Sequence, residues 1–560
     1  MVFFVDCLKQ TRIELPQPQQ LFTWPLLIRR VSPAIFLLVL ATASLWWRCT
    51  AFDFVFDDHA QIQANPRIQS VVYLKELVTQ PLWEQLGPGR ASHYYRPAFS
   101  LLLLSQYLAF GLDPGPWHLT SLILYILVVL SVFLLLLLLF EMVFPAFAGS
   151  LLFAVLPIHA EVVSWVSASD ESLFSLFLVL SLCSLILADK ATAPRRRVGW
   201  LLLSSCLFAV SLFSKETAIG AGLSLVVFGL IPSHRRKERA ISACLVYLIP
   251  ATVYMIVRWL VLRGTTLPVE PRPFLSVLSL LPSLAMLTIR QLFWPVNTSL
   301  FYDVHAMRSG WVIFAWLAAL LLAGIYQAYR KAPISLGILA LLISPLLPWF
   351  AALFYLSDSA LFQNRYLYLP TLAAAVLLAF LLTKTSGHPP IQWVFSVGVL
   401  VLCAALAAAA RRAMSPYQND ISLFRRAVSL APQNVLAWGL LAEAEARIGD
   451  DHNAESFYKK AVLLRSDLWE TNFHLAMNDL RHGRANDASE SLRKSLASQY
   501  ARPGERALSW YEMGKIEAAQ GRVTDAEHSF LQAEKLEPSS KKVHAELARL
   551  TEGHSARQPN

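Results

Sequence analysis

The chain is 560 residues long, and 56% of its residues are hydrophobic while only 15% are charged, against roughly 25% charged residues in an average soluble domain. The mean hydropathy is +0.48, and the apolar residues form long runs. This composition excludes a soluble globular enzyme, a disordered chain and a disulfide-rich secreted scaffold, and it predicts a membrane protein. The net charge of +10 does not indicate nucleic-acid binding, because the basic residues cluster in short patches between apolar runs.

A membrane-spanning helix needs about 20 mostly apolar residues. Two apolar stretches, residues 143–157 and 276–296, are short or are interrupted by Pro282 and Arg290. The basic patches can all lie on the cytoplasmic side only if these two stretches dip into the membrane without crossing it. The sequence therefore predicts eleven crossings, with the N-terminus inside and the C-terminus outside. The predicted spans are residues 33–50, 97–112, 117–139, 172–189, 198–213, 217–232, 240–262, 311–329, 334–356, 366–384 and 391–410.

This topology divides the first part of the chain into a cytoplasmic segment, residues 1–32, and a transmembrane domain, residues 33–412. It also places the loops 52–95, 140–171 and 263–310 together on the outer side. Most polar residues that lie next to apolar segments fall in these loops and in two short outer hairpins. The chemistry is therefore expected at one face of the membrane.

The first outer loop contains two adjacent carboxylates, Asp57 and Asp58, soon after the first span. Their mutual repulsion and partial desolvation would raise the pKa of at least one of them, which suits a general base. Taken alone, the pair is better explained as a helix cap followed by a solvated turn.

Three cations are expected at the outer ends of spans: Arg96, Lys215 and Arg365. An arginine there can bind a donor phosphate with two hydrogen bonds, or it can extend to lipid head groups. Lys215 lies in a tight hairpin, where a buried charge must be paired or functional. We expect Glu216 to be its resting partner and Lys215 to offset phosphate charge when a substrate binds.

His159 and Glu161 follow the apolar stretch 143–157. In an extended loop their side chains would point the same way and could bind a substrate hydroxyl or a divalent cation. A single His-x-Glu pair does not define a metal site, and no metal site is assigned. Glu216, and Tyr366 beside Arg365, are the other two candidate substrate-binding residues. Outward-facing acids and cations suit transfer of a sugar from a polyprenyl phosphate to a hydroxyl, because a cation stabilises the leaving phosphate while a carboxylate removes the acceptor proton.

After the last span the composition becomes that of a soluble helical domain, residues 413–560. Gly449, Gly483 and Gly521 are each followed five residues later by an alanine. This spacing is typical of tetratricopeptide repeats, whose period is about 34 residues. Such repeats form a curved solenoid that would hold a polypeptide substrate or partner near the membrane, and a purely structural cap is the alternative. The predicted repeats lie near residues 435–468, 469–502 and 507–540.

The order of these motifs resembles the transmembrane and tetratricopeptide-repeat-containing proteins, which are GT-C superfamily glycosyltransferases related to protein O-mannosyltransferases. The resemblance implies an all-α membrane domain and inverting transfer of a hexose, expected to be mannose, from a polyprenyl-phosphate donor to Ser or Thr hydroxyls of proteins. It implies that Asp57 or Asp58 is the base, without choosing between them. The motifs are Asp57-Asp58, Tyr95-Arg96-Pro97, Pro157 to Glu161, Lys215-Glu216 and Arg365 to Pro370.

The repeat array is short, which suggests a bacterial relative with its solenoid in the periplasm; in a eukaryote the membrane would be the endoplasmic reticulum. Three alternatives remain open at this point. The acceptor could be a lipid or a glycan, the chain could be a transporter, or it could be a non-catalytic scaffold that uses only its solenoid. A transporter is disfavoured because no inverted repeats are visible.

Overall fold

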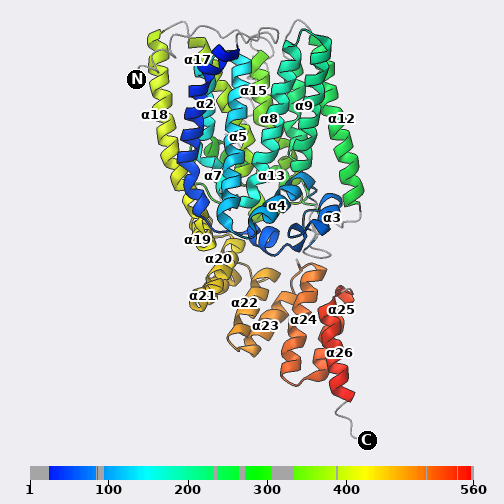
Figure 1. Ribbon diagram of the computed structural model, residues 1–560. Helices are drawn as coiled ribbons and strands as arrows, with labels where there is room; N and C mark the ends of the chain where they lie inside the picture. The colour runs from blue at the N-terminus through cyan, green and yellow to red at the C-terminus, as the bar shows by residue number, and fades with distance from the viewer. Residues whose placement is uncertain are drawn as a thin grey trace.

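The computed structural model describes residues 24–83, 85, 94–230, 236–263, 271–304, 333–385, 389–499, 501–538 and 540–555. These residues form helices joined by turns and contain no strand. Figure 1 shows a bundle of long helices and, below it, a row of shorter helices that ends at the C-terminus. The structure therefore shows the predicted all-α architecture, with a membrane domain followed by a helical solenoid.

The membrane domain is built from helices α2 to α18. Their bounds are α2 (Trp24–Trp46), α3 (Leu74–Thr79), α4 (Pro97–Phe110), α5 (Pro114–Phe140), α6 (Val143–Ala154), α7 (Ala160–Ser164), α8 (Ser169–Lys190), α9 (Pro194–Ser214), α10 (Ala218–Ala221), α11 (Leu223–Leu230), α12 (Arg236–Leu262), α13 (Phe274–Phe293), α15 (Pro333–Ile343), α16 (Leu347–Ala352), α17 (Leu372–Thr385) and α18 (Pro389–Met414).

Within the described residues, nine helices are long and apolar enough to cross a membrane. The number is ten if α6 and the segment Pro157–Ser164, which meet at a 53° bend, count as one broken span. Helix α13 passes the same test by length and composition, whereas the sequence predicted that residues 276–296 would not cross.

Two other predicted spans are shorter than a full crossing, since α4 and the segment Ala218–Gly229 belong to the apolar helices of 10–17 residues. The predicted span 311–329 lies outside the described residues. The described part of the chain is thus a multi-pass membrane protein, and its candidate spans differ from the predicted ones at α4, at residues 218–229 and at α13.

Helices α5 and α8 lie in the middle of the bundle. Trp117 and Tyr125 of α5 are fully buried, as is Phe174 of α8. By contrast α12 and α18 lie on the outside (Figure 1), and their exposed side chains include Trp259 and Trp393. An apolar surface of this kind is what a helix presents to lipid.

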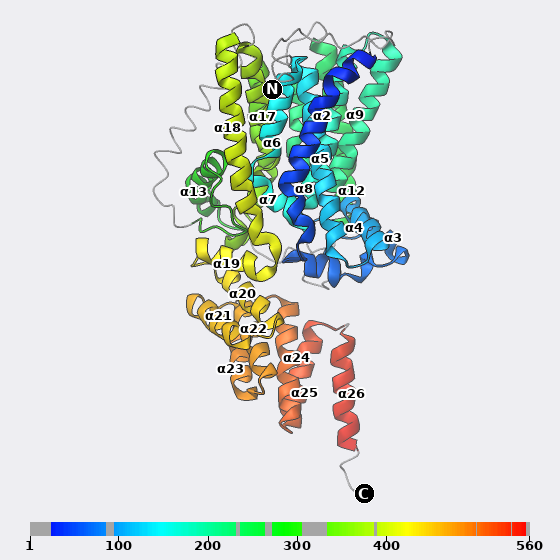
Figure 2. The same cartoon turned by 60° about the vertical axis from the view of Figure 1, so that its left-hand side comes forward.

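The solenoid follows a connecting helix, α19 (Asp420–Leu430). Its helices pack in successive pairs, each a helical hairpin, below the bundle (Figure 2). Gly449, Gly483 and Gly521 close the first helix of each hairpin with φ angles of +83°, +71° and +76°. Only glycine adopts this left-handed conformation at little cost, which explains the repeated glycine. The helices are α20 (Val435–Arg447), α21 (Asp451–Leu464), α22 (Trp469–Arg481), α23 (Ala485–Leu496), α24 (Pro503–Ala519), α25 (Val523–Leu536) and α26 (Lys541–Ser555).

Candidate active site

A cavity of about 790 Å³ lies where the membrane domain meets the solenoid. Most of its wall comes from the loop that carries α3, the start of α8, the turn after α9 and the turn before α17, but Arg502 from the solenoid also lines it. Apolar side chains, among them Pro345, Trp349 and Leu356, form another part of the wall. The charged lining residues are Asp57, Asp170, Glu171, Glu216, Arg96, Lys215, Arg258, Arg365 and Arg502.

The two adjacent acids of the first loop have different surroundings. Asp58 is fully buried and accepts hydrogen bonds from the backbone N–H of Val55 (3.1 Å) and from the N–H (2.8 Å) and hydroxyl (2.5 Å) of Ser167. Asp57 lines the cavity, and its carboxylate has no hydrogen bond or ion pair within the described part of the chain. Asp58 therefore ties the loop to the segment before α8, while Asp57 faces the space where a substrate can bind.

An unusual backbone turn separates these two orientations. Phe56 has a φ of +53°, a conformation that costs energy for a residue with a bulky side chain. Its ring packs against those of Trp165, Phe301 and Phe424, with centroids 5.6–6.0 Å apart. The packing holds a strained turn immediately before Asp57.

The surroundings also change the acidity of both carboxyl groups. Burial raises the pKa of Asp57 to about 6, although the positive charge of Arg365 lowers it in part. Burial raises the pKa of Asp58 to about 7, against the hydrogen bonds from Ser167 and Val55. A carboxylate with a pKa just below neutral can take a proton from a substrate near physiological pH.

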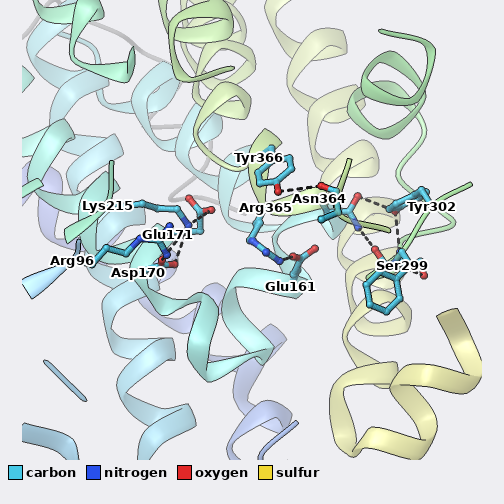
Figure 3. Close-up of polar contacts among 12 residues, drawn as sticks. Arg96, Glu161, Asp170, Glu171, Lys215, Ser299, Tyr302, Asn364, Arg365 and Tyr366 are labelled. Atoms are coloured by element: carbon cyan, nitrogen blue, oxygen red, sulfur yellow. Dashed lines mark hydrogen bonds and ion pairs between the residues drawn. The ribbon is translucent and has the colours of Figure 1, made fainter. Parts of the chain in front are cut away.

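Arg96 makes ion pairs inside the protein and does not extend to lipid. It donates to Asp170 at 2.6 Å (Figure 3). It also donates to the carboxylate of Glu216 through two nitrogens, of which Nε lies 2.8 Å from Oε2. The guanidinium also lies over the ring of Tyr94, 4.4 Å from its centroid. Arg96 thus belongs to a buried ion-pair network and does not face lipid, while its expected binding of a donor phosphate stays a prediction.

Lys215 does not pair with Glu216, and that expectation was wrong. Its Nζ lies 2.7 Å from Glu171 and 3.1 Å from Asp170. Lys215 follows the end of α9 in an extended conformation, with φ −160° and ψ 137°, so the neighbouring side chain of Glu216 points the other way, toward Arg96. The result is one connected cluster of two cations and three acids.

Arg365 forms a second ion pair nearby. Its Nη1 lies 2.6 Å from Glu161 (Figure 3). Its guanidinium lies 4.9 Å from the ring centroid of Trp165. The preceding residue, Asn364, is fixed by hydrogen bonds with the hydroxyl of Tyr302 (2.9 Å) and the carbonyl of Ser299 (3.1 Å). This network fixes the turn that carries Arg365.

Tyr366 lines the cavity beside Arg365, and its ring packs against Trp349 with centroids 5.4 Å apart. The hydroxyl of Tyr366 donates to the carbonyl of Ala360 at 3.4 Å. Its place in the cavity wall keeps it available as a substrate contact.

His159 and Glu161 do not point the same way, contrary to expectation. Residues 157–159 form a 3-10 turn that leads into α7, so the chain is helical there and not extended. His159 is fully buried, with its ring nitrogens 2.8 Å from the Tyr125 hydroxyl and 2.9 Å from Thr371, whereas Glu161 binds Arg365. Among the described residues, no group of three or more His, Cys, Asp or Glu side chains is placed to hold a metal ion.

No protein-family model matches the chain. The chain is 24% identical over 569 residues to the protein O-mannosyl-transferase TMTC3 of Mus musculus, covering 91% of this chain and 60% of the relative. It is 26% identical over 487 residues to TMTC4 of the same species, covering 73% of this chain and 63% of the relative. The chain is thus similar to the TMTC proteins over most of its length. It spans about 60% of the length of these relatives.

A solved structure of ArnT from Cupriavidus metallidurans bound to undecaprenyl phosphate is similar with a TM-score of 0.38 and 15% identity, covering 82% of this chain and 79% of that chain. The similarity to the TMTC proteins confirms the resemblance that the ordered motifs indicated.

Several charged residues at the cavity were missed or misjudged from the sequence. Asp170 and Glu171 stand at the start of a long apolar helix and were not among the predicted site residues, yet both line the cavity and are only 2–3% exposed. Carboxylates at the buried end of an apolar span were the available signal. Arg502 gave no such signal, because it lies in a soluble domain where an arginine is ordinary.

Proposed function

We propose that the chain is a membrane glycosyltransferase that transfers a hexose, mannose first among the candidates, from a polyprenyl-phosphate donor to a Ser or Thr hydroxyl of a protein. The observation that carries this proposal is the position of Asp57, a carboxylate in the cavity wall without a hydrogen-bonding partner among the described residues. The same cavity contains Arg365 close enough for its charge to lower the pKa of Asp57. The names of the TMTC relatives support the sugar and the kind of acceptor.

In the proposed reaction, Asp57 accepts the proton of the acceptor hydroxyl. The hydroxyl oxygen attacks the anomeric carbon of the donor sugar from the side opposite the phosphate. The bond between that carbon and the phosphate oxygen breaks, and its electron pair leaves with polyprenyl phosphate. Attack from the opposite side inverts the configuration, and the proton remains on Asp57 until solvent removes it.

We assign the main stabilisation of the leaving phosphate to Arg365. Within the described part of the chain Arg365 has one acidic partner, Glu161, whereas Arg96 and Lys215 have two each. Arg365 therefore has guanidinium donors available for a phosphate, and donors fixed before the reaction stabilise charge that develops on the leaving group. Arg96 and Lys215 add positive charge to the cavity while they hold Asp170.

The polypeptide acceptor is supported by the position of the solenoid. Arg502 shows that the solenoid borders the cavity, so a chain bound along the repeats would pass its opening. The apolar wall near Trp349 suits the first isoprene units of the donor lipid. We infer that this end of the bundle faces the periplasm or an equivalent lumen, because the basic patches between predicted spans belong inside.

The test is sugar transfer by purified protein in liposomes supplied with radiolabelled polyprenyl-phosphate mannose and a Ser/Thr-rich acceptor protein. Asp57→Asn keeps the shape of the side chain but cannot accept the proton, so transfer should fall by about 10²–10⁴-fold while the protein stays folded. Asp53→Asn is a matched control in the same loop, since Asp53 is exposed and outside the cavity lining; it should transfer as the wild type does.

Asp58→Asn separates the two acids. Because Asp58 ties Val55 to Ser167, its loss should reduce the amount of folded protein more than the transfer rate per folded molecule. Normal transfer by Asp57→Asn would overturn the assignment of the base. Absence of transfer by the wild type with any polyprenyl-linked sugar would overturn the enzyme proposal and favour a scaffold.

A further inference from the structure

One carboxylate outside the cavity, Asp420, contacts the strained turn from the far side. Asp420 is the first residue of α19, the helix that joins the last span to the solenoid. Its Oδ1 accepts the backbone N–H of Phe56 at 2.8 Å, although 364 residues separate the two in sequence. Its Oδ2 lies 2.7 Å from His59 Nε2 and 2.7 Å from Nη1 of Arg447.

These contacts hold one short segment of the first loop between two elements. Phe56 precedes the proposed base, Asp57, and His59 follows it by two residues. On the other side, Asp420 belongs to α19 and Arg447 to the last turn of α20, the first helix of the solenoid. The carboxylate of Asp420 is thus the point at which the base-bearing loop, the connecting helix and the solenoid meet.

Two further contacts reinforce this junction. The ring of Phe56 packs edge-on against Phe424 of α19, with centroids 6.0 Å apart. The backbone N–H of Asp53 donates to the carbonyl of Gln418, just before α19, at 3.0 Å. The loop is therefore docked on the connecting segment by backbone, ring and carboxylate together.

The surroundings of Asp420 favour the ionised form of its carboxyl group. Its side chain is 11% exposed, and burial alone would raise its pKa. The hydrogen bonds from His59 and Phe56 and the charge of Arg447 outweigh that effect and lower the pKa of Asp420 below its ordinary value. His59 Nδ1 lies 2.6 Å from Gln63 Oε1, and His59 Nε2 lies near both Asp420 Oδ2 (2.7 Å) and Nη1 of Arg447 (2.6 Å).

We propose that Asp420 is a positioning residue for Asp57: it holds the left-handed turn at Phe56, and through Arg447 it makes the solenoid part of the active-site scaffold. This inference rests on the proposed function, since it assigns Asp57 as the group being positioned. A bulky residue keeps a positive φ only where its surroundings fix it, and Asp420 supplies the acceptor for the N–H of that residue. Without it the turn can relax, and Asp57 moves relative to the acceptor hydroxyl.

The kinetic test uses the full chain in liposomes. Asp420→Ala should lower kcat by about 10- to 100-fold with little change in the KM for the donor, because a displacement of about 1 Å can cost about 10²-fold. Asp420→Asn keeps an oxygen acceptor for Phe56 but loses the charge toward His59 and Arg447, so it should fall between Asp420→Ala and the wild type. It also remains informative if the alanine variant is poorly folded.

Asp479→Asn is the matched control. Asp479 is an acidic residue of the solenoid whose side chain is 8% exposed, close to the value for Asp420. It is paired with Arg484 at 2.7 Å and lies away from the first loop. Its substitution perturbs a comparable ion pair, so kcat should stay at the wild-type value.

A double variant separates positioning from general destabilisation. If Asp420 acts only through Asp57, the variant Asp57→Asn/Asp420→Ala should transfer no more slowly than Asp57→Asn alone. The proposal would be overturned if the rate losses of the two single variants multiplied in the double variant. It would also be overturned if Asp420→Ala kept the wild-type kcat.

Amide hydrogen exchange supplies a readout that does not need activity. In Asp420→Ala the peptide that contains Phe56 should exchange several-fold faster than in the wild type and in Asp479→Asn. Unchanged exchange would overturn the positioning role. If the wild type transfers no sugar but the exchange of Phe56 responds to Asp420, the proposed function fails while the structural link between solenoid and loop stands.

Discussion

Two lysine–glutamate ion pairs of the same length show how differently the cavity and the solenoid use charge. Lys215 lies 2.7 Å from Glu171 at the cavity, and Lys515 lies 2.7 Å from Glu512 in α24. The side chains at the cavity are 6% and 3% exposed, whereas in the solenoid Lys515 is 47% exposed and Glu512 13%. Distance alone therefore does not distinguish a group with a role at the site from an ordinary surface charge.

The difference lies in what happens when one partner is removed. In the solenoid, water solvates the remaining charge, and a surface pair contributes little to stability. At the cavity the remaining carboxylate, that of Glu171, is only 3% exposed and loses its counter-ion, so the desolvation cost of its charge is no longer offset. The cavity also concentrates charges that constrain one another, because Asp170 binds both Lys215 and Arg96.

The largest expected effect is that of removing the buried lysine. Lys215→Met keeps the length of the side chain but leaves Glu171 without its cation, and we expect the free energy of unfolding to fall by about 3–5 kcal/mol. Thermal unfolding in detergent, followed by tryptophan fluorescence, measures the loss. An unchanged melting temperature would show that water reaches this cluster and would remove the distinction between the two regions.

The next effect concerns the cation assigned to the phosphate. Arg365→Gln should lower the transfer rate by about 10²–10³-fold, because the leaving phosphate loses a fixed donor. Arg365→Lys should recover part of the rate through its charge alone, since lysine lacks the two-pronged geometry.

Loss of Arg365 also leaves Glu161 buried without a partner, so a control must separate chemistry from folding. The double variant Glu161→Gln/Arg365→Gln removes that orphaned charge and should restore stability without restoring transfer. Recovery of transfer in the double variant would show that Arg365 serves only to neutralise Glu161.

The features that the sequence did predict depend on local rules. Helix α5 covers residues 114–140 against a predicted span of 117–139, because length and apolarity are sufficient to define a span. The repeat followed from Gly449 and its two equivalents, whose positive φ explains why that position is glycine. The presence of cations and acids at one end of the bundle was likewise predicted from topology.

The features that it did not predict depend on contacts between distant segments. Lys215 was paired with its neighbour because no sequence rule shows that residues 170 and 171 lie beside it. Phe56 carries no sign of its left-handed backbone, since glycine or asparagine would be the usual residue there. The choice between Asp57 and Asp58 required Ser167, whose N–H and hydroxyl bind only one of them.

The pH dependence of transfer tests the environment of Asp57. Only the deprotonated carboxylate accepts a proton, and its pKa is raised to about 6 by burial, so the rate should be level above pH 7 and fall about tenfold per pH unit below pH 6. Initial rates between pH 5 and 8 measure it, with donor binding recorded at each pH. A rate that stays constant down to pH 5 would mean either that Asp57 is as acidic as a solvated carboxyl group or that it is not the base.

The smallest expected effect completes the comparison from the solenoid side. Lys515→Met breaks a pair as short as that of Lys215, but Glu512 lies one turn away on the same helix, and water replaces the lost ammonium. Stability should change by less than about 0.5 kcal/mol, within the range of ordinary surface substitutions. Transfer should stay at the wild-type rate, because neither residue lines the cavity. If Lys515→Met lowered the melting temperature as far as Lys215→Met does, both variants would be acting on general helix packing. Burial would then no longer explain the larger loss of stability expected at the cavity.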